Sequence, residues 1–329
     1  MDTVYVDYSR SAPVAGMVIG GMTVAERVLR DAARSGASRA IVRGDGAVLP
    51  SLAALPLAVE IVGGDTAVPA HAAPIDGDVV AGVKVSDEAS RRRAAHALFQ
   101  TCRRPYDGLG DRYVIRAVSL RMTSLFCRLG LTPNQVTSAN ILIGLAACYA
   151  AALGTALGFV LAGALMFVQV VLDSSDGELA RIRHMHSRFG MWLDNTSDDV
   201  IDNLFLAALG IGMGGTWMWI GVGAAALRGF VALWTHTAVA LMGKPGDVLA
   251  FKWWFDGADE TLAERFDTKT SFVGVLRSVG RRDLYCLIYA ASCMATVPVA
   301  GLFIGVANAI VHFALLVAHV AITAGRGRS

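Results

Sequence analysis

Seven acidic residues interrupt the long apolar segments in the middle of this sequence. They are Asp173, Asp176, Glu178, Asp194, Asp198, Asp199 and Asp202. An aspartate at the centre of a membrane helix costs about 2.5–3.5 kcal/mol, so such residues are retained there mainly for function. Carboxylate oxygens are the preferred ligands of hard cations, which indicates Mg²⁺ or Mn²⁺ before Zn²⁺. The cluster therefore predicts a metal site.

The spacing of the carboxylates places them on helical faces. Asp173 and Asp176 are three residues apart, and Asp194, Asp198 and Asp202 follow at intervals of four, so each set lines one face of a helix. The short connection between the two sets makes their helices antiparallel neighbours. Four or more carboxylates then converge on one point, where their repulsion requires cations. The number of ligands suits two metal ions.

The composition places these helices in a membrane. Hydrophobic residues make up 54% of the 329 residues, charged residues 17%, and the mean hydropathy is +0.51, far above that of soluble domains. The formal charge of +2 and the lack of basic segments interleaved with aromatics argue against a nucleic-acid partner. The five cysteines lack metal-ligand spacing and act as small hydrophobes. No cleavable signal peptide is apparent.

Six apolar segments after Pro133 have the length of about 20 residues needed to cross a bilayer. They cover residues 134–154, 157–181, 190–213, 216–242, 282–300 and 302–324. Lys and Arg gather in alternate connections and after the last segment, whereas the connections between them contain neither. By the positive-inside rule, both termini and the acidic cluster face the cytoplasm, in a prokaryotic-type inner or plasma membrane.

Two more parts precede the apolar segments. Residues 1–90 predict a small cytoplasmic α/β domain, with strands at 4–8, 39–43 and 57–62 and a helix at 22–36. Residues 91–130 predict a link that ends in a helix with alternating arginines and apolar side chains. Such a helix lies at the membrane surface, or alternatively packs on the soluble domain. Residues 131–329 complete a mainly α, polytopic membrane protein.

The acidic segment spells D-x2-D-G-x2-A-R-x8-G-x3-D-x3-D. Its eight fixed positions are Asp173, Asp176, Gly177, Ala180, Arg181, Gly190, Asp194 and Asp198. This pattern resembles the signature of the CDP-alcohol phosphotransferase (CDP-alcohol phosphatidyltransferase) family at all eight positions. The resemblance implies a membrane enzyme that transfers a substituted phosphate group from a CDP-linked donor to an alcohol and releases CMP.

The resemblance also implies residue roles. Asp173, Asp176, Asp194 and Asp198 would hold two Mg²⁺ or Mn²⁺ ions, and Asp198 would also act as the general base on the alcohol. The nucleotide would lie against Gly177, Ala180, Arg181 and Gly190. The segment LTPNQVT at 131–137 resembles the start of the first span in this family, where Asn134 and Thr137 would touch the nucleotide.

Structural alternatives accompany these roles. Gly177 and Gly190 could allow close helix packing, and Arg181 could be a positive-inside anchor. The segment that contains Asn134 and Thr137 is also an ordinary helix start, with a threonine cap followed by proline.

Several charged residues and histidines outside the signature have either a functional or a structural interpretation. Asp202 could be catalytic or could pair with a buried cation, and Arg228 could grip an anionic head group or form a salt bridge with Asp202. Asp199 occupies a position where we expect a basic residue in many relatives. The histidines at 236, 312 and 319 favour helix contacts over metal binding.

The N-terminal segment GGMTVAERVLRDAARSGASRAIV resembles the first helix and second strand of sugar-phosphate nucleotidyltransferases. No Gly-rich loop with a basic residue stands ahead of Met22 to hold a triphosphate, and Gly20-Gly21 alone is a weak signal. This domain is therefore expected to be truncated and degenerate, with a scaffolding or regulatory role.

The favoured function is a step of phospholipid biosynthesis with CDP-diacylglycerol as the donor and an inositol phosphate or glycerol phosphate as the anionic acceptor. A CDP-inositol-dependent phosphodiester synthase is the first alternative. A cation-coupled membrane transporter is an alternative from a different class, although an ion path does not require the glycines and arginine between the carboxylates. Membrane lipid is an expected partner, and a homodimer is compatible with this organisation.

Overall fold

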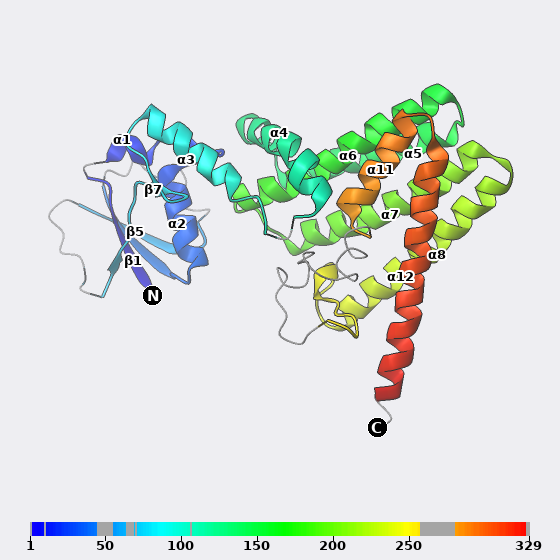
Figure 1. Ribbon diagram of the computed structural model, residues 1–329. Helices are drawn as coiled ribbons and strands as arrows, with labels where there is room; N and C mark the ends of the chain where they lie inside the picture. The colour runs from blue at the N-terminus through cyan, green and yellow to red at the C-terminus, as the bar shows by residue number, and fades with distance from the viewer. Residues whose placement is uncertain are drawn as a thin grey trace. The chain divides into compact units, whose positions relative to one another are not determined.

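The computed structural model describes residues 2–9, 11–44, 55–63, 69, 71–105, 107–256 and 280–326. The chain divides into two compact units (Figure 1). The first unit contains Met1–Arg103 with the short segments Ser124–Gly130 and Leu179–Met185, and the second contains the remaining residues. The connection between the fourth and fifth predicted spans contains several Lys and Arg residues. Three of them lie outside the described residues: Arg265, Lys269 and Arg277.

The first unit contains the predicted α/β layer. Strands β1 (Thr3–Asp7), β4 (Arg39–Arg43), β5 (Ala58–Val62) and β6 (Ala73–Pro74) form a parallel sheet in the order β5-β4-β1-β6. Helix α2 (Val24–Arg34) lies between β1 and β4 in the sequence and directly precedes β4. Its first turn is capped by Thr23, whose hydroxyl accepts a hydrogen bond from the Glu26 amide at 3.2 Å. These elements confirm the α/β expectation.

Smaller elements complete this unit. They are helix α1 (Ala12–Ala15), the hairpin of β2 (Val18–Ile19) and β3 (Met22–Thr23), the hairpin of β7 (Val79–Val80) and β8 (Val83–Lys84), and helix α3 (Glu88–Gln100). Helix α3 begins at a capping box in which Asp87 and Ser90 satisfy each other's backbone amides.

Among the described residues, four helices are long and apolar enough to cross a membrane. They are α5 (Pro133–Ala152), α6 (Ala156–Ile182), α8 (Gly215–Leu241) and the first 27 residues of α12 (Pro298–Arg326). These helices support an integral membrane protein.

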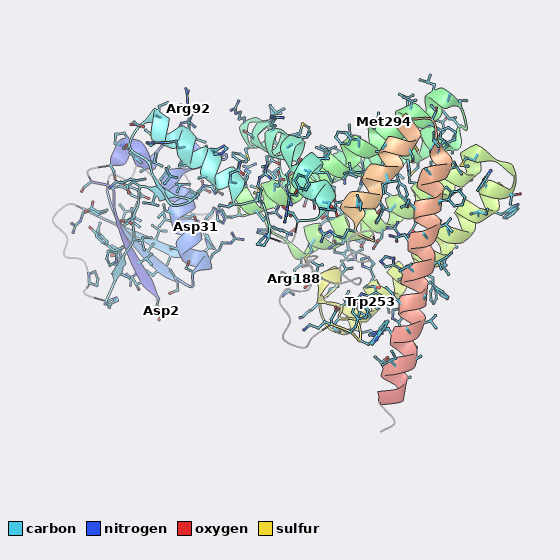
Figure 2. All side chains as sticks on the ribbon, in the orientation of Figure 1. Asp2, Asp31, Arg92, Arg188, Trp253 and Met294 are labelled. Atoms are coloured by element: carbon cyan, nitrogen blue, oxygen red, sulfur yellow. The ribbon has the colours of Figure 1, made fainter. Side chains whose placement is uncertain are left out.

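The predicted count of six spans is not confirmed. Helix α7 (Arg188–Met213) occupies the third predicted span, but its four aspartates make it too polar to qualify by composition. Helix α11 (Arg282–Met294) occupies the fifth and has only 13 residues; Figure 2 shows Met294 at its end. A helix of that length rises about 20 Å, less than the thickness of the hydrocarbon core.

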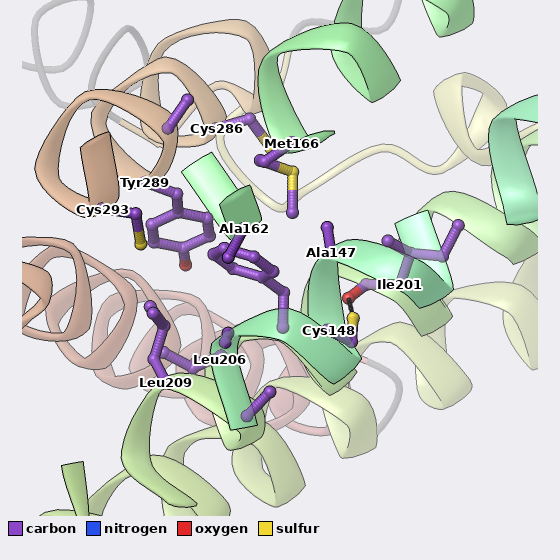
Figure 3. Packing of buried hydrophobic residues seen from close by; sticks show 14 of the residues in the cluster. Ala147, Cys148, Ala162, Met166, Ile201, Leu206, Leu209, Cys286, Tyr289 and Cys293 are labelled. Atoms are coloured by element: carbon purple, nitrogen blue, oxygen red, sulfur yellow. Dashed lines mark hydrogen bonds between the residues drawn. The ribbon is translucent and has the colours of Figure 1, made fainter. Parts of the chain in front are cut away.

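The core of the second unit lies where these helices pack together. Met166, Phe205, Leu206 and Tyr289 are fully buried. Figure 3 shows Met166, Leu206 and Tyr289 grouped with small alanine and cysteine side chains. The rings of Phe205 and Tyr289 stack with their centroids 5.6 Å apart. The cluster joins residues of α5, α6, α7, α8, α11 and α12, so it fixes the helices that carry the acidic residues.

Glycines set the distance between α7 and α8. A Cβ atom on Gly221 would lie 2.8 Å from the Cα atom of Gly210 and 2.9 Å from the Leu206 carbonyl oxygen. Such close approach of backbones is a common way for membrane helices to gain packing energy. Two residues further along α8, Gly223 meets nothing within 4 Å.

The predicted juxtamembrane helix is present as a π-helical turn, η3 (Asp111–Ile115), followed by α4 (Arg116–Leu129). A buried ionic network holds it against α6. Glu178 accepts hydrogen bonds from Arg116 Nη1 at 2.5 Å and from the hydroxyls of Ser119 and Thr123 at 2.6 Å. Arg116 also pairs with Asp107 at 3.0 Å. Because removal of one partner would leave an uncompensated buried charge, this network fixes α4 on α6.

The outer face of this helix mixes apolar and basic side chains. Tyr113 is 72% exposed and Leu129 63% exposed, and Arg112, Arg121 and Arg128 are exposed beside them. This pattern is typical of a helix at a membrane surface, and that location stays a prediction.

We expect Gly221→Val to lower the thermal unfolding midpoint by roughly 3–8 °C, because an overpacked helix contact costs about 1–3 kcal/mol. The measurement is thermal unfolding of the purified protein in detergent. Gly223→Val is the matched control because the same side chain enters open space on the same helix. Equal midpoints for the two variants would contradict the close α7–α8 contact.

Candidate active site

Helices α6 and α7 bring three of the predicted ligands together. One carboxylate oxygen from each of Asp173, Asp194 and Asp198 lies within 4.8 Å of the others. Helix α7 starts at Ser187, whose hydroxyl accepts a hydrogen bond from the Gly190 amide at 2.9 Å. This start places Asp194 and Asp198 on consecutive turns of the face toward Asp173.

Asp176 lies beside this group. It is 3% exposed and close enough to Asp173 and Asp194 for their charges to act on it. The Thr137 hydroxyl donates a hydrogen bond to Asp176 Oδ2 at 2.7 Å and also contacts the Pro133 carbonyl at 3.1 Å. Thr137 therefore orients a predicted metal ligand. The spacing of the motif did not reveal this hydrogen bond.

Arg282 supplies positive charge to the carboxylates. Its Nη1 atom lies 2.6 Å from Asp173 Oδ2 and 2.9 Å from Asp198 Oδ2. Its Nε atom lies 3.1 Å from Asp202 Oδ2, and Nη2 donates to Gln169 Oε1 at 3.2 Å. The sequence pattern did not place Arg282 against the carboxylates, because this residue is 84 positions away from Asp198 along the chain. The one signal was a pair of arginines at the start of an apolar segment.

Asp202 and Arg228 form the salt bridge that was one of the two alternatives for these residues. Arg228 Nη2 lies 3.2 Å from Asp202 Oδ2. The Tyr285 hydroxyl donates to the same oxygen at 2.6 Å, and its ring lies 4.5 Å from the Arg228 guanidinium. Asp202 is fully buried and is neutralised by Arg228 and Arg282, so it is a structural partner of both cations.

Asp199 turns away from this network. Its Oδ2 atom lies 2.9 Å from His236 Nε2 on α8. His312 contacts the Asn308 carbonyl at 2.9 Å, and His319 lies 5.2 Å from the Phe251 ring. His236 and His312 thus make contacts between and within helices, in agreement with the helix-contact interpretation, whereas His319 packs on an aromatic side chain that follows η4 (Val248–Ala250).

The residues predicted to meet the nucleotide occupy helix ends. Gly177, Ala180 and Arg181 lie in the last turns of α6, where each is partly exposed. A Cβ atom on Gly190 would lie 2.9 Å from Asn134 Oδ1, so this glycine lets the first turn of α7 approach α5.

The start of α5 matches the ordinary helix-start alternative. The Thr132 hydroxyl accepts a hydrogen bond from the Gln135 amide, the Gln135 side-chain oxygen accepts one from the Thr132 amide, and Pro133 occupies the first turn. Asn134 is exposed beside this cap.

A second acidic pair, which sequence reasoning missed, lies between η3 and the start of α11. The Asp111 amide donates to Asp283 Oδ2 at 3.2 Å, and Arg281 Nε lies 3.0 Å from Asp283 Oδ1. Burial, with the charge of Asp283 as a second cause, raises the pKa of Asp111 to about 6. Gly108 packs on the Asp283 carboxylate, and Gly110 packs on the Asp283 backbone, where a Cβ atom would lie 2.6 Å from the carbonyl oxygen.

The carboxylate group fits a divalent metal ion by the chemistry of its atoms. Within the part of the chain that the structure describes, Asp194 Oδ1 and Asp198 Oδ1 are buried without a hydrogen-bond partner. Oxygen atoms of this kind are costly unless a donor or a cation satisfies them. A set of carboxylate oxygens alone suits hard ions such as Mg²⁺ and Mn²⁺.

Comparisons with known proteins agree with this chemistry. The model of the CDP-alcohol phosphatidyltransferase family matches residues 130–325, more than half of the chain. The "Archaetidylinositol phosphate synthase" of Pyrococcus horikoshii is 39% identical over 99 residues, which are 30% of this chain and 50% of that protein. The "Bifunctional IPC transferase and DIPP synthase" of Aquifex aeolicus is 35% identical over 111 residues, 34% of this chain and 25% of that protein.

A protein with that same name from Thermococcus kodakarensis is 35% identical over 125 residues, 38% of this chain and 28% of that protein. The chain thus aligns with between a quarter and a half of the length of these relatives. The family match includes every carboxylate of the α6–α7 cluster together with the residues at the ends of these helices. The chain belongs to the CDP-alcohol phosphatidyltransferase family.

Proposed function

We propose that this protein transfers a substituted phosphate group from CDP-diacylglycerol, or a similar CDP-linked lipid, to an inositol phosphate or glycerol phosphate and releases CMP. The observation that carries the proposal is the convergence of Asp173, Asp194 and Asp198, two of which have unsatisfied buried oxygens. Family membership makes the chain a transferase with a CDP-linked donor and an alcohol acceptor, and it argues against the transporter alternative.

The aspartates would hold two divalent ions. Asp173, Asp176, Asp194 and Asp198 are the ligands in this proposal, and Thr137 keeps the Asp176 carboxyl in place. When bound, Mg²⁺ or Mn²⁺ would neutralise the diphosphate and polarise the phosphorus atom that is attacked.

Asp198 is the proposed general base. Its Oδ1 atom has no hydrogen-bond partner among the described residues, so it can accept the proton of the acceptor hydroxyl. The acceptor oxygen then forms a bond to phosphorus while the bond from phosphorus to the CMP oxygen breaks. Arg181 would pair with phosphate oxygens of the donor, with the remaining contacts made by Gly177, Ala180, Gly190 and Asn134.

Buried cations favour an anionic acceptor. Arg282 faces the carboxylates directly, and Arg228 supports it through Asp202. Together with two bound divalent ions, these arginines would outweigh the charge of Asp202 and the four ligand aspartates, and the positive site would attract a phosphate-bearing alcohol more strongly than a neutral one. The name of the Pyrococcus relative, with inositol phosphate in its product, supports the inositol phosphate class.

A CDP-inositol-dependent phosphodiester synthase is the second candidate, supported by the relatives whose names include DIPP synthase. In both candidates, residues 1–90 form a degenerate nucleotidyltransferase-like domain, 91–130 the link and 131–329 the membrane domain. Both termini and the active site face the cytoplasm, and a homodimer is compatible with the arrangement.

We expect CMP release when purified protein and Mg²⁺ or Mn²⁺ are given CDP-diacylglycerol and an inositol phosphate, and we expect EDTA to abolish it because the carboxylates then lack their cations. The measurement is CMP formation across a panel of CDP donors and alcohols. CDP-inositol as the preferred donor would select the second candidate. No CMP from any pair would contradict both.

We expect Asp198→Asn to lower the rate of CMP release by at least about 100-fold, because the amide cannot take the alcohol proton. The control is Asp199→Asn, which makes the same change one residue later on the face toward His236. It should keep most of the activity and the same thermal midpoint. An Asp198→Asn enzyme with the unaltered rate would exclude this residue as the base.

We expect Arg282→Gln to lower the thermal midpoint of the metal-free protein, because Asp173 and Asp198 lose their shared cation. Saturating Mn²⁺ should then raise the midpoint by more than in the unaltered protein, since the metal no longer competes with a guanidinium. The measurement is thermal unfolding with EDTA and with Mn²⁺. The control is Arg281→Gln, which removes the partner of Asp283 instead and should leave the Mn²⁺-induced rise of the midpoint unchanged. If Mn²⁺ raised the midpoints of Arg282→Gln and of the unaltered protein equally, the competition between Arg282 and the metal would be contradicted.

A further inference from the structure

The C-terminal end of α6 belongs to the first compact unit, and nearly all of its last carbonyl groups have backbone partners. The Arg183 amide donates to the Leu179 carbonyl and the Met185 amide to the Ala180 carbonyl, each at 2.9 Å. The second bond follows His184, which has a φ of 51° and ends the helix in a left-handed conformation. The His184 amide donates to the Arg181 carbonyl at 3.4 Å. The Ile182 carbonyl is left for a side chain.

Arg27 of α2 provides that side chain. Its Nη1 atom donates to the Ile182 carbonyl at 2.8 Å, and Nη2 donates to the Ile19 carbonyl at 2.9 Å. Arg27 is only 2% exposed, and burial lowers its pKa. A cation at a helix C-terminus is stabilised by the helix dipole, so one guanidinium caps α6 and holds the β2–β3 hairpin at the same time.

The turn of this hairpin touches the same helix end. Gly20 and Gly21 have φ angles of 59° and 78°, the left-handed pair that a two-residue hairpin turn requires. A Cβ atom on Gly20 would lie 2.7 Å from Ile182 Cγ2, and one on Gly21 would lie 3.0 Å from the Cys127 carbonyl oxygen at the end of α4. The turn therefore packs against the ends of α6 and α4.

We propose that Arg27 and the Gly20-Gly21 turn form a docking site for the C-terminal end of α6. The α/β layer thereby positions the helix that carries Asp173, Asp176 and Arg181. Ile182 follows Asp176 by six residues, about 9 Å along the helix axis. A helix transmits a displacement of its end to this distance, and small errors in the placement of catalytic groups are costly. The effect on catalysis rests on the proposed function, whereas the docking itself does not.

Hydrogen–deuterium exchange of the purified full-length protein tests the docking directly. We expect Arg27→Met to increase exchange of the Arg183 and Met185 amides roughly ten-fold, because the helix end loses a charged hydrogen-bond partner. Amides of β1 and β4 should keep their protection, which shows that the layer remains folded. Arg34→Met is the matched control, since Arg34 is exposed on the same helix. Unchanged exchange at the end of α6 in Arg27→Met would overturn the docking.

A second pair of variants covers the case in which Arg27→Met does not fold. Gly20→Ala and Gly36→Ala both place a side chain at a positive φ, but Gly36 meets nothing within 4 Å. Only Gly20→Ala should expose the end of α6 to exchange. Equal exchange at that end in the two variants would also overturn the docking.

The positioning role is tested by CMP release from the same variants. We expect Arg27→Met to lower kcat about ten-fold with little change in the KM of the acceptor, and Arg27→Lys to recover part of the loss. If Arg27→Met exchanged faster at the end of α6 but kept the same kcat, the positioning role would be overturned and the docking would still be supported. If the unaltered protein releases no CMP with any donor, the proposed function fails while the exchange result still decides the docking.

Discussion

Repulsion among buried carboxylates is the constraint on which this membrane fold depends. Asp173, Asp176, Asp194 and Asp198 meet between two helices, where their partial burial limits the screening of their charges by water. Positive charge must therefore come from elsewhere in the chain, and the described residues show one such source in Arg282. Helix α11 therefore begins with Arg282, whose guanidinium lies against Asp173 and Asp198, which explains why a charged residue starts a short apolar helix.

Each further charge near the cluster is balanced by its own partner. Asp202 lies between two guanidiniums, Glu178 receives three donors from α4, and Asp283 pairs with Arg281. Removing one member of such a pair is far more costly than removing both. The surroundings of the site thus hold the carboxylates rigidly without neutralising all of them, which leaves the oxygens of Asp194 and Asp198 available for metal.

Periodicity and spacing predicted the local features well. The α/β layer, the positions of the apolar helices and the meeting of the α6 and α7 aspartates all follow from patterns of two, three and four residues. The count of six spans is not confirmed, because hydropathy cannot distinguish α11 from a spanning helix until its length is known. The hydrogen bond of Thr137 to Asp176 and the ion pairs of Arg282 join distant segments, and the pattern of a single sequence does not show which distant residues meet.

The ends of α6 and α4 belong to the compact unit that contains the α/β layer, whereas most of α6 belongs to the other. One continuous helix is thus a member of two compact units. If the α/β layer positions α6 as proposed, selection on the active site also acts on the surface of this layer. A change at the β2–β3 hairpin would then displace the helix that carries the metal ligands. On that proposal the layer is retained as a mechanical part of its neighbour, independently of any chemistry of its own.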